Sequence, residues 1–267
     1  GNLVLYDSII DGGIIDGWQE VMLSYIEQDV VAFSTKNDGN NFVAITDGGY
    51  IYYSTDKGAT WKQGFSAPTL YWVAVASNND YFIATGVDNA GDSTQIYYSS
   101  NGETWKKATT PLINKNLSEI LSNGQNFLAV KELQGDEVGK GAVMYYSTDN
   151  TGEKWLPSKI PSSVRGIKLA AGGNGIYICM MQNDTTNISL YISTDNGENW
   201  TALNVGSGSE VWHYVYSNGS SFIVVGLQDN LINNAMYFSP DGVNWNNVSN
   251  ESSTIPLADL GDLQIVS

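Results

Sequence analysis

The sequence predicts an all-β fold, namely a six-bladed β-propeller built from four-stranded antiparallel blades. The first observation is a tryptophan-bearing turn, whose tryptophan recurs after 44, 50, 45 and 45 residues. A period in this range is typical of propellers and other repeat arrays. The second observation is an aromatic residue that precedes each turn at a similar spacing, at Phe42, Phe82, Phe127, Tyr177 and Phe222. Each repeat contains two apolar segments and a Tyr-rich segment, and a fourth segment begins at the tryptophan. This pattern predicts four strands per repeat.

We call the tryptophan-bearing segments the repeated turns. Ser and Asp side chains can accept hydrogen bonds from the backbone of a turn, Gly supplies a positive φ, and Trp buries a large apolar face. Each position therefore has a structural role, and the Asp residues are not predicted to be catalytic. The predicted structural residues are Ser54, Asp56, Gly58 and Trp61; Ser99, Asn101, Gly102 and Trp105; Ser147, Asp149, Gly152 and Trp155; Ser193, Asp195, Gly197 and Trp200; and Ser239, Asp241, Gly242 and Trp245.

The ends of the chain complete the predicted ring. Residues 5–8 and 17–18 resemble a degenerate copy of the third and fourth strands of a blade. Trp18 precedes Trp61 by 43 residues. Residues 263–267 occupy the place of a second strand. We therefore expect one domain over 1–267, with blade repeats ending near the six tryptophans and the last blade closed by N- and C-terminal strands, which removes free sheet edges. Because the chain begins with Gly1, we expect a mature form or a domain of a larger polypeptide.

The repeated turns resemble the Asp-box, also called the bacterial neuraminidase repeat (BNR), in which Ser-x-Asp-x-Gly-x-x-Trp follows a short apolar strand. The resemblance covers nearly the whole chain. The superfamily includes sialidases, other glycoside hydrolases, sorting receptors, photosystem assembly factors, and secreted or phage-borne propellers. The resemblance thus implies a sialidase-like propeller architecture, and it leaves the function open.

Composition excludes several classes of function. The formal net charge is −16 and the pI is about 4.1, which argues against binding to nucleic acid or to anionic membranes. No stretch is long enough for a membrane-spanning helix. The single cysteine, Cys179, rules out an internal disulfide, and its apolar surroundings predict a buried side chain.

The candidate binding residues lie among the long connections, which a meander places at the end of the blades opposite the repeated turns. Loops on a rigid scaffold often carry function. Trp and Tyr rings stack on sugars and anchor protein partners, although Trp72 and Trp212 could equally be core residues between blades. His213 is the only histidine, so a structural or surface role is favoured over a general base or metal ligand. The candidates are Trp72, Trp212, Tyr71, His213, Tyr214 and Tyr25.

Carboxylates are plentiful in the long connections, but the sequence does not pair them. A glycosidase needs two carboxyl groups roughly 5–10 Å apart. Three acidic pairs offer oxygen ligands for calcium, yet none has EF-hand-like spacing, so we predict no metal site and no cofactor. The carboxylates are Asp88, Asp92, Glu132, Asp136, Glu137, Asp184 and Asp229, and the calcium candidates are Asp88-Asn89, Asp136-Glu137 and Asp229-Asn230.

The sequence lacks the residues that several known catalytic sites require, and this favours a binding function. A sialidase holds its substrate carboxylate with three arginines, and Arg165 is the only arginine. No Gly-x-Ser-x-Gly motif is present. We therefore expect a non-catalytic recognition or adhesion module that binds a glycan or protein and is extracellular, on a cell surface or on a virion such as a phage tail. The alternatives are a glycoside hydrolase acting on a neutral polysaccharide and a structural or assembly-factor propeller.

Overall fold

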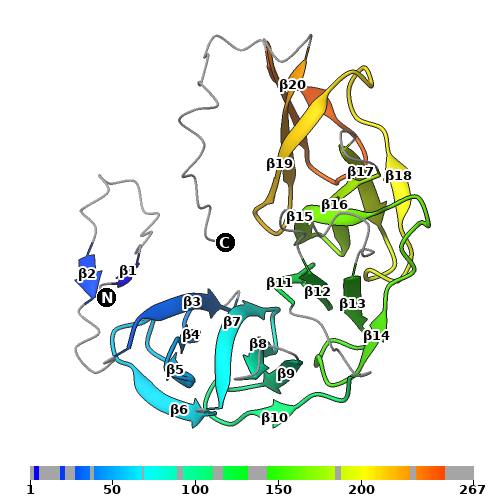
Figure 1. Ribbon diagram of the computed structural model, residues 1–267. Coiled ribbons are helices and arrows are strands. Elements are labelled where there is room, and N and C mark those ends of the chain that lie inside the picture. The colour runs from blue at the N-terminus through cyan, green and yellow to red at the C-terminus, as the bar shows by residue number, and fades with distance from the viewer. Residues whose placement is uncertain are drawn as a thin grey trace. The chain divides into compact units, whose positions relative to one another are not determined.

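The computed structural model describes residues 3–5, 19–21, 28–36, 39–67, 69–88, 93–110, 117–131, 143–183, 188–228 and 233–249. These residues form antiparallel strands joined by turns, and they contain no helix (Figure 1). The chain divides into two compact units. The first comprises residues 1–108 and 112–116, and the second comprises 109–111 and 117–267.

The first unit holds two four-stranded sheets and one two-stranded sheet, each with its strands in chain order. The two-stranded sheet pairs β1 (Leu3–Leu5) with β2 (Gln19–Val21). The four-stranded sheets are β3 (Val30–Thr35), β4 (Phe42–Thr46), β5 (Tyr50–Ser54) and β6 (Lys62–Ser66), and β7 (Leu70–Ser77), β8 (Phe82–Asp88), β9 (Thr94–Ser99) and β10 (Lys106–Lys107).

The second unit holds three four-stranded sheets of the same meander topology. The first is β11 (Glu119–Ser122), β12 (Phe127–Lys131), β13 (Val143–Ser147) and β14 (Trp155–Pro157). The second is β15 (Gly166–Gly173), β16 (Ile176–Gln182), β17 (Ile188–Ser193) and β18 (Thr201–Leu203). The third is β19 (Val211–Ser217), β20 (Phe222–Gln228), β21 (Asn233–Ser239) and β22 (Asn246–Asn247).

The second strands of the four-stranded sheets are largely apolar because both of their faces pack inside the protein, least completely in β20, where Ile223 is 36% exposed. In β12, Phe127, Leu128, Ala129 and Val130 are all buried. Such runs are typical of strands covered on both sides, and they replace the alternation of a half-exposed sheet. Within the second unit, one core joins residues of β12 and β16, and another joins residues of β16 and β20. The sheets therefore stack face to face within each unit.

The first strand of four sheets contains a register shift that the sequence did not reveal. The shifts lie between Val30 and Ala32, Trp72 and Ala74, Ile167 and Leu169, and Trp212 and Tyr214. Each leaves one extra residue in the first strand, as in a β-bulge, which bends the strand and changes the direction of its side chains.

The prediction of four antiparallel strands per repeat is confirmed for these five sheets. At the N-terminus, Leu3–Leu5 pairs with Gln19–Val21. The strands predicted over 5–8 and 17–18 fall, except for Leu5, outside the described residues. Residues 6–18 and 263–267 lie outside the described residues, so the sixth blade and the ring closure remain predictions.

Candidate functional site

All five repeated turns have the same framework. Their glycines take positive φ values between 71° and 91°, which Gly tolerates because it has no Cβ. The tryptophan that follows donates its indole N–H to the carbonyl of that glycine, with distances between 2.8 and 3.1 Å. In the two copies with one residue more than the shortest, Lys57 and Asn196 also adopt a left-handed conformation before the glycine. The indole ring is thereby fixed against its own turn.

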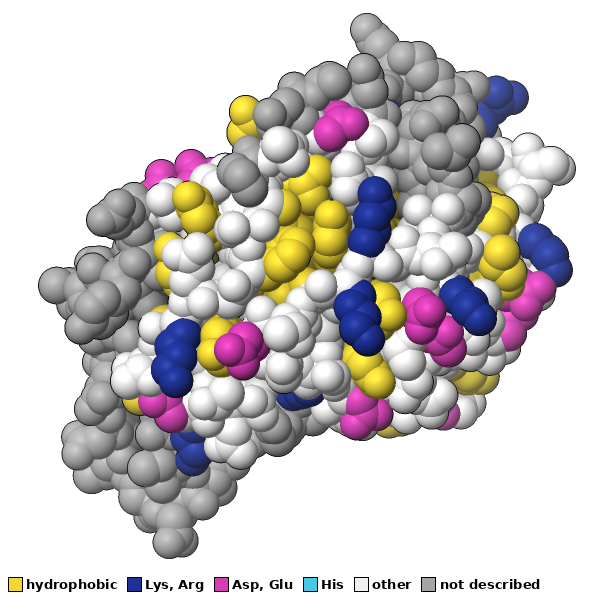
Figure 2. Space-filling view, turned by 90° about the horizontal axis from the view of Figure 1, so that it is seen from below, with side chains coloured by type: hydrophobic (Ala, Val, Ile, Leu, Met, Phe, Trp, Pro, Cys, Tyr) yellow, Lys and Arg dark blue, Asp and Glu magenta, His cyan; other side chains and the backbone are white. Residues whose placement is uncertain are grey.

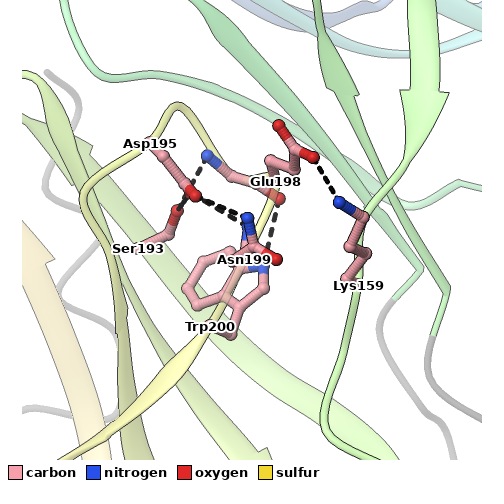
Figure 3. Close-up of polar contacts among 7 residues, drawn as sticks. Lys159, Ser193, Asp195, Glu198, Asn199 and Trp200 are labelled. Carbon is pink, nitrogen blue, oxygen red and sulfur yellow. Dashed lines mark hydrogen bonds and ion pairs between the residues drawn. The ribbon is translucent and has the colours of Figure 1, made fainter.

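Ser and Asp side chains close the turn, as the fourth copy shows (Figure 3). The Ser193 hydroxyl donates to Asp195 Oδ1 at 2.8 Å and accepts from the Gly197 N–H at 2.9 Å. Asp195 Oδ1 also accepts from the Asn199 N–H at 2.9 Å. The first, second and fifth copies have the same bonds around Ser54, Ser99 and Ser239. The local hydrogen bonding predicted from the sequence is therefore confirmed in four copies.

The third copy differs because it is the longest. The Ser147 hydroxyl donates to the Asp149 carbonyl and accepts from the N–H of Phe127 on the neighbouring strand. The Gly152 N–H reaches Asp149 Oδ1 at 3.1 Å instead of the serine. For Ser147, the prediction of a bond from the backbone of its own turn was wrong, since the longer turn brings a different acceptor to the glycine.

Three of the turn carboxylates, Asp56, Asp195 and Asp241, are held in the ionised form. Hydrogen bonds from the Thr60 hydroxyl and N–H lower the pKa of Asp56. The pKa of Asp195 is also lowered, because its bonds from Asn199 and Ser193 outweigh the opposing effect of burial. Bonds from the Asn244 N–H and side chain hold the pKa of Asp241 well below its usual range. Groups so engaged suit a structural role and are poor proton donors.

The repeated turns share one end of the sheets with the short turns between the first and second strands. In the first unit, Lys36 lies in such a short turn, and its ammonium group donates to the carbonyls of Asp80 and Ser100, at 2.6 Å each. In the second unit, the Asn123 amide donates to Asn196 Oδ1 at 3.1 Å. The sequence predicted this common end, and the hydrogen bonds confirm it. We call it the turn end, and the opposite end the loop end.

Trp72 and Trp212 lie in the hydrophobic cores near the loop end. Their exposed fractions are 3% and 6%. The Trp72 ring meets Tyr97 edge-on at 5.6 Å between centroids, and Trp212 meets Tyr237 in the same way at 5.9 Å. Of the two interpretations that the sequence left open, these positions favour the core one, because the indole faces are covered by protein.

Three other predicted candidates reach solvent. Tyr71 is 57% exposed, although its neighbours Leu70 and Trp72 are both buried. His213 is exposed at the register shift of β19, and Tyr214 beside it is half-buried. The His213 and Tyr214 rings lie 6.4 Å apart. Tyr71 belongs to the first unit, and His213 and Tyr214 belong to the second.

Parts of the long connections fall outside the described residues, and so do Tyr25, the calcium candidates 136–137 and 229–230, Asn89 of the third candidate, and the other candidate carboxylates except Asp88. The Asp88 carboxylate accepts from the Ser93 hydroxyl at 2.7 Å. Within the described ranges, no three His, Cys, Asp or Glu side chains gather as a metal-binding group. Cys179 is buried as predicted, and burial raises the pKa of its thiol.

Glu210 is a functional candidate that sequence reasoning missed. It is buried at the loop end, just before β19. Burial opposes its ionisation, but bonds from the Ser207 and Gly208 N–H groups and the Ser207 hydroxyl outweigh this effect and lower its pKa to about 2. The surrounding Gly-Ser-Gly-Ser run signals a turn, but the burial of the carboxylate has no sequence signal.

The described surface carries mixed charge. On the face drawn in Figure 2, Lys and Arg side chains are interspersed with Asp, Glu and hydrophobic side chains, without an extended basic patch. This agrees with the acidic composition and gives no support to nucleic-acid binding. In the described part of the chain, no helix has the length and apolar character needed to cross a membrane.

No protein-family model matches the sequence, and no curated protein is significantly similar to it. Solved structures do share its fold. A GH74 enzyme from Niastella koreensis has a TM-score of 0.51 and 17% identity over 82% of this chain and 38% of its own. YCF48 from Cyanidioschyzon merolae has a TM-score of 0.51 and 16% identity over 86% and 74% of the two chains. A structure of YCF48 bound to D1 peptide has a TM-score of 0.54 and 15% identity over 86% and 72%.

These likenesses support a β-propeller fold for this chain. At such identities they concern the fold alone. The chain also spans well under half the length of the GH74 enzyme.

Proposed function

We propose that this chain is a non-catalytic recognition module, which binds a protein or glycan partner through the loop end of its sheets. The observation that carries the proposal is the contrast between the two ends. At the turn end, Ser and Asp side chains are engaged in bonds within their own turns. At the loop end, Tyr71 and His213 are exposed on strands whose backbone is fixed.

Tyr71 has the properties of an anchor residue. Its ring is exposed, while Leu70 and Trp72 on either side are each 3% exposed and hold the strand in place. A rigid aromatic ring loses little conformational entropy on binding and offers both apolar area and a hydroxyl. His213 is exposed as well, whereas Tyr214 beside it is half-buried and offers only part of its ring.

The charge of the chain restricts the partner. A net charge of −16 favours neutral or basic ligands over acidic ones. The structure of YCF48 with D1 peptide supports peptide recognition as a role for this fold, although it does not identify a ligand for this chain.

The test is binding of the full chain to a panel of neutral glycans and of neutral or basic peptides. Tyr71→Ala, His213→Ala and Tyr214→Ala should be made separately, with Val243→Ser as control, because Val243 is 61% exposed in the repeated turn of the last described sheet. Loss of an aromatic anchor should weaken binding by about tenfold or more. Binding that survives all three loop-end changes would remove these residues from the proposal.

Two alternatives remain for experiment. A hydrolase would release reducing sugar from a neutral polysaccharide, and one Asp→Asn change in a long connection, beginning with Asp88, would abolish that release. The resemblance to a GH74 enzyme makes this assay worthwhile. An assembly factor would instead co-purify with a protein partner in fixed stoichiometry and bind no glycan.

We further propose that the repeated turns are Asp-boxes of a single six-bladed ring, and that the protein acts outside the cell or on a virion without a cofactor. The geometry of the five described turns supports the first part. Chelation with EDTA should leave the melting temperature unchanged. A fall on chelation would indicate a structural calcium ion instead.

A further inference from the structure

One face of the sheet β19–β22 is less covered than the corresponding faces of the other sheets. Ile223, which follows the recurring aromatic residue Phe222 in β20, is 36% exposed. The residues that follow the recurring aromatic residue in the other four sheets are fully buried, namely Val43, Ile83, Leu128 and Ile178, each at 0%. An apolar residue follows the recurring aromatic residue in all five sheets. The difference in exposed fraction therefore comes from what covers each sheet.

The register identifies the neighbours of Ile223 on this face. Tyr216 and Phe238 lie directly opposite Ile223 on the adjoining strands, and Tyr214 lies opposite Val225. Directly opposed residues point to the same side of a sheet. The alternate residues Phe222 and Val224 point the other way, into the core shared with β15–β18. We call Tyr214, Tyr216, Ile223 and Phe238 the open face.

The open face has the character of an interior surface. Tyr214 and Tyr216 stack with their rings 5.9 Å apart and 11° from parallel, and both are half-buried, as is Phe238. A contiguous apolar surface of this kind marks a site for another part of the protein or a partner.

We propose that residues 250–267 of this chain cover the open face. The chain leaves β22 at Asn247 on this same sheet, and the last described residue, Ser249, comes two positions later. In the earlier sheets of the second unit, the next sheet begins a few residues after the fourth strand. Thus β14 ends at Pro157 and β15 begins at Gly166, and β18 ends at Leu203 and β19 begins at Val211. The segment after Ser249 therefore starts where a covering sheet would follow.

The composition of residues 250–267 fits this position. They contain Ile255, Leu257, Leu260, Leu263, Ile265 and Val266. Burying these side chains against Ile223, Phe238 and the two tyrosines would remove apolar surface of both segments from water. A second copy of the chain could supply the same cover only by dimerising, which the experiment detects.

Thiol labelling in the full chain tests the proposal. Ile223→Cys reports on the open face, and Val243→Cys is an accessible control at the turn end. The native Cys179 is fully buried and supplies the background. We expect the thiol at position 223 to react at least about tenfold more slowly than the thiol at position 243, in a particle with the mass of one chain. The added changes Leu263→Ser and Ile265→Ser should then accelerate labelling at position 223 without altering labelling at position 243.

Three results would overturn the proposal. The first is labelling at 223 as fast as at 243, because the face would then be open. The second is slow labelling in a particle of twice the chain mass, because a second copy would then be the cover. The third is slow labelling in a monomer that the tail changes do not accelerate.

Should the tail variants fail to fold, disulfide trapping replaces them. A second cysteine is placed at Leu260, Leu263 or Ile265 in turn with Ile223→Cys. At least one pair should form an intramolecular disulfide on oxidation, and failure of all three would contradict the proposal. None of these readouts depends on ligand binding, so the proposed function and this inference can fail separately.

Discussion

The phenol of Tyr237 donates a hydrogen bond to the buried carboxylate of Glu210 at 3.1 Å. The same phenol accepts a bond from the Asn247 amide at 3.2 Å, and its ring lies edge-on against Trp212. Glu210 in turn binds the backbone N–H groups of Ser207 and Gly208. One carboxylate thus joins the loop that enters β19 to the third strand of the sheet, so the loop end is ordered by polar bonds as well as by packing.

Glu210 should make stability depend on pH in the acid range. Its folded-state pKa of about 2 lies below the usual 4.5, so the ionised carboxylate stabilises the fold above about pH 4.5, and this contribution is lost as the pH falls toward 2. After allowance for solvent screening we expect about 1–2 kcal/mol. Denaturant unfolding between pH 2 and 7 should show a smaller pH dependence in Glu210→Gln than in the wild type. The exposed Glu153→Gln is the control, and an equal change in both variants would contradict the assignment.

Lys36→Met should destabilise the first unit. Lys36 is buried, with its ammonium group between the carbonyls of Asp80 and Ser100 and 5.1 Å from the centre of the Phe82 ring. Removing the ammonium group deletes two hydrogen bonds from a charged donor, at a cost of about 1–3 kcal/mol. The exposed Lys62→Met should change the free energy of unfolding by less than about 0.5 kcal/mol. Similar values for both would show that the Lys36 bonds contribute little.

Gly102→Ala and Gly124→Ala form a matched pair. Both glycines have positive φ, at 76° and 89°, so both variants carry the strain of a left-handed alanine. A Cβ at Gly102 would lie 2.9 Å from Val43 Cγ2 and 3.0 Å from Tyr53 Cβ, whereas a Cβ at Gly124 would meet nothing within 4 Å. Gly102→Ala should therefore cost at least about 1 kcal/mol more in thermal or denaturant unfolding. An equal loss of unfolding free energy in the two variants would mean that Val43 and Tyr53 move aside to accommodate the added Cβ.

Asn101→Asp should leave stability unchanged or raise it, whereas Asp56→Asn should lower it by about 1 kcal/mol. Asn101 Oδ1 accepts from Ser99 and from the N–H groups of Glu103 and Thr104, which a carboxylate can also do. Asp56 uses both carboxyl oxygens toward Thr60, and an amide would turn a donor toward one of these bonds. Melting temperatures compare the two variants, and a marked loss for Asn101→Asp would contradict this account.

The sequence by itself determined the repeat, the four strands of each described sheet, the positive φ of the turn glycines and the common end of the two kinds of turn. These features depend on residues close together in the chain, so the residue types and their spacing in the sequence are enough to predict them. Even there, one extra residue in the third copy redirected the bonds of Ser147.

Tertiary structure alone decided which aromatic residues reach solvent. Tyr71 and Trp72 are adjacent and equally suited to binding in the sequence, yet one is 57% and the other 3% exposed. The register shifts of the first strands, the buried carboxylate of Glu210 and the incomplete cover of Ile223 likewise had no signal in the sequence. In stacked sheets both faces of a strand can be buried, so alternation does not distinguish core from surface, and exposure depends on which sheet lies next to it.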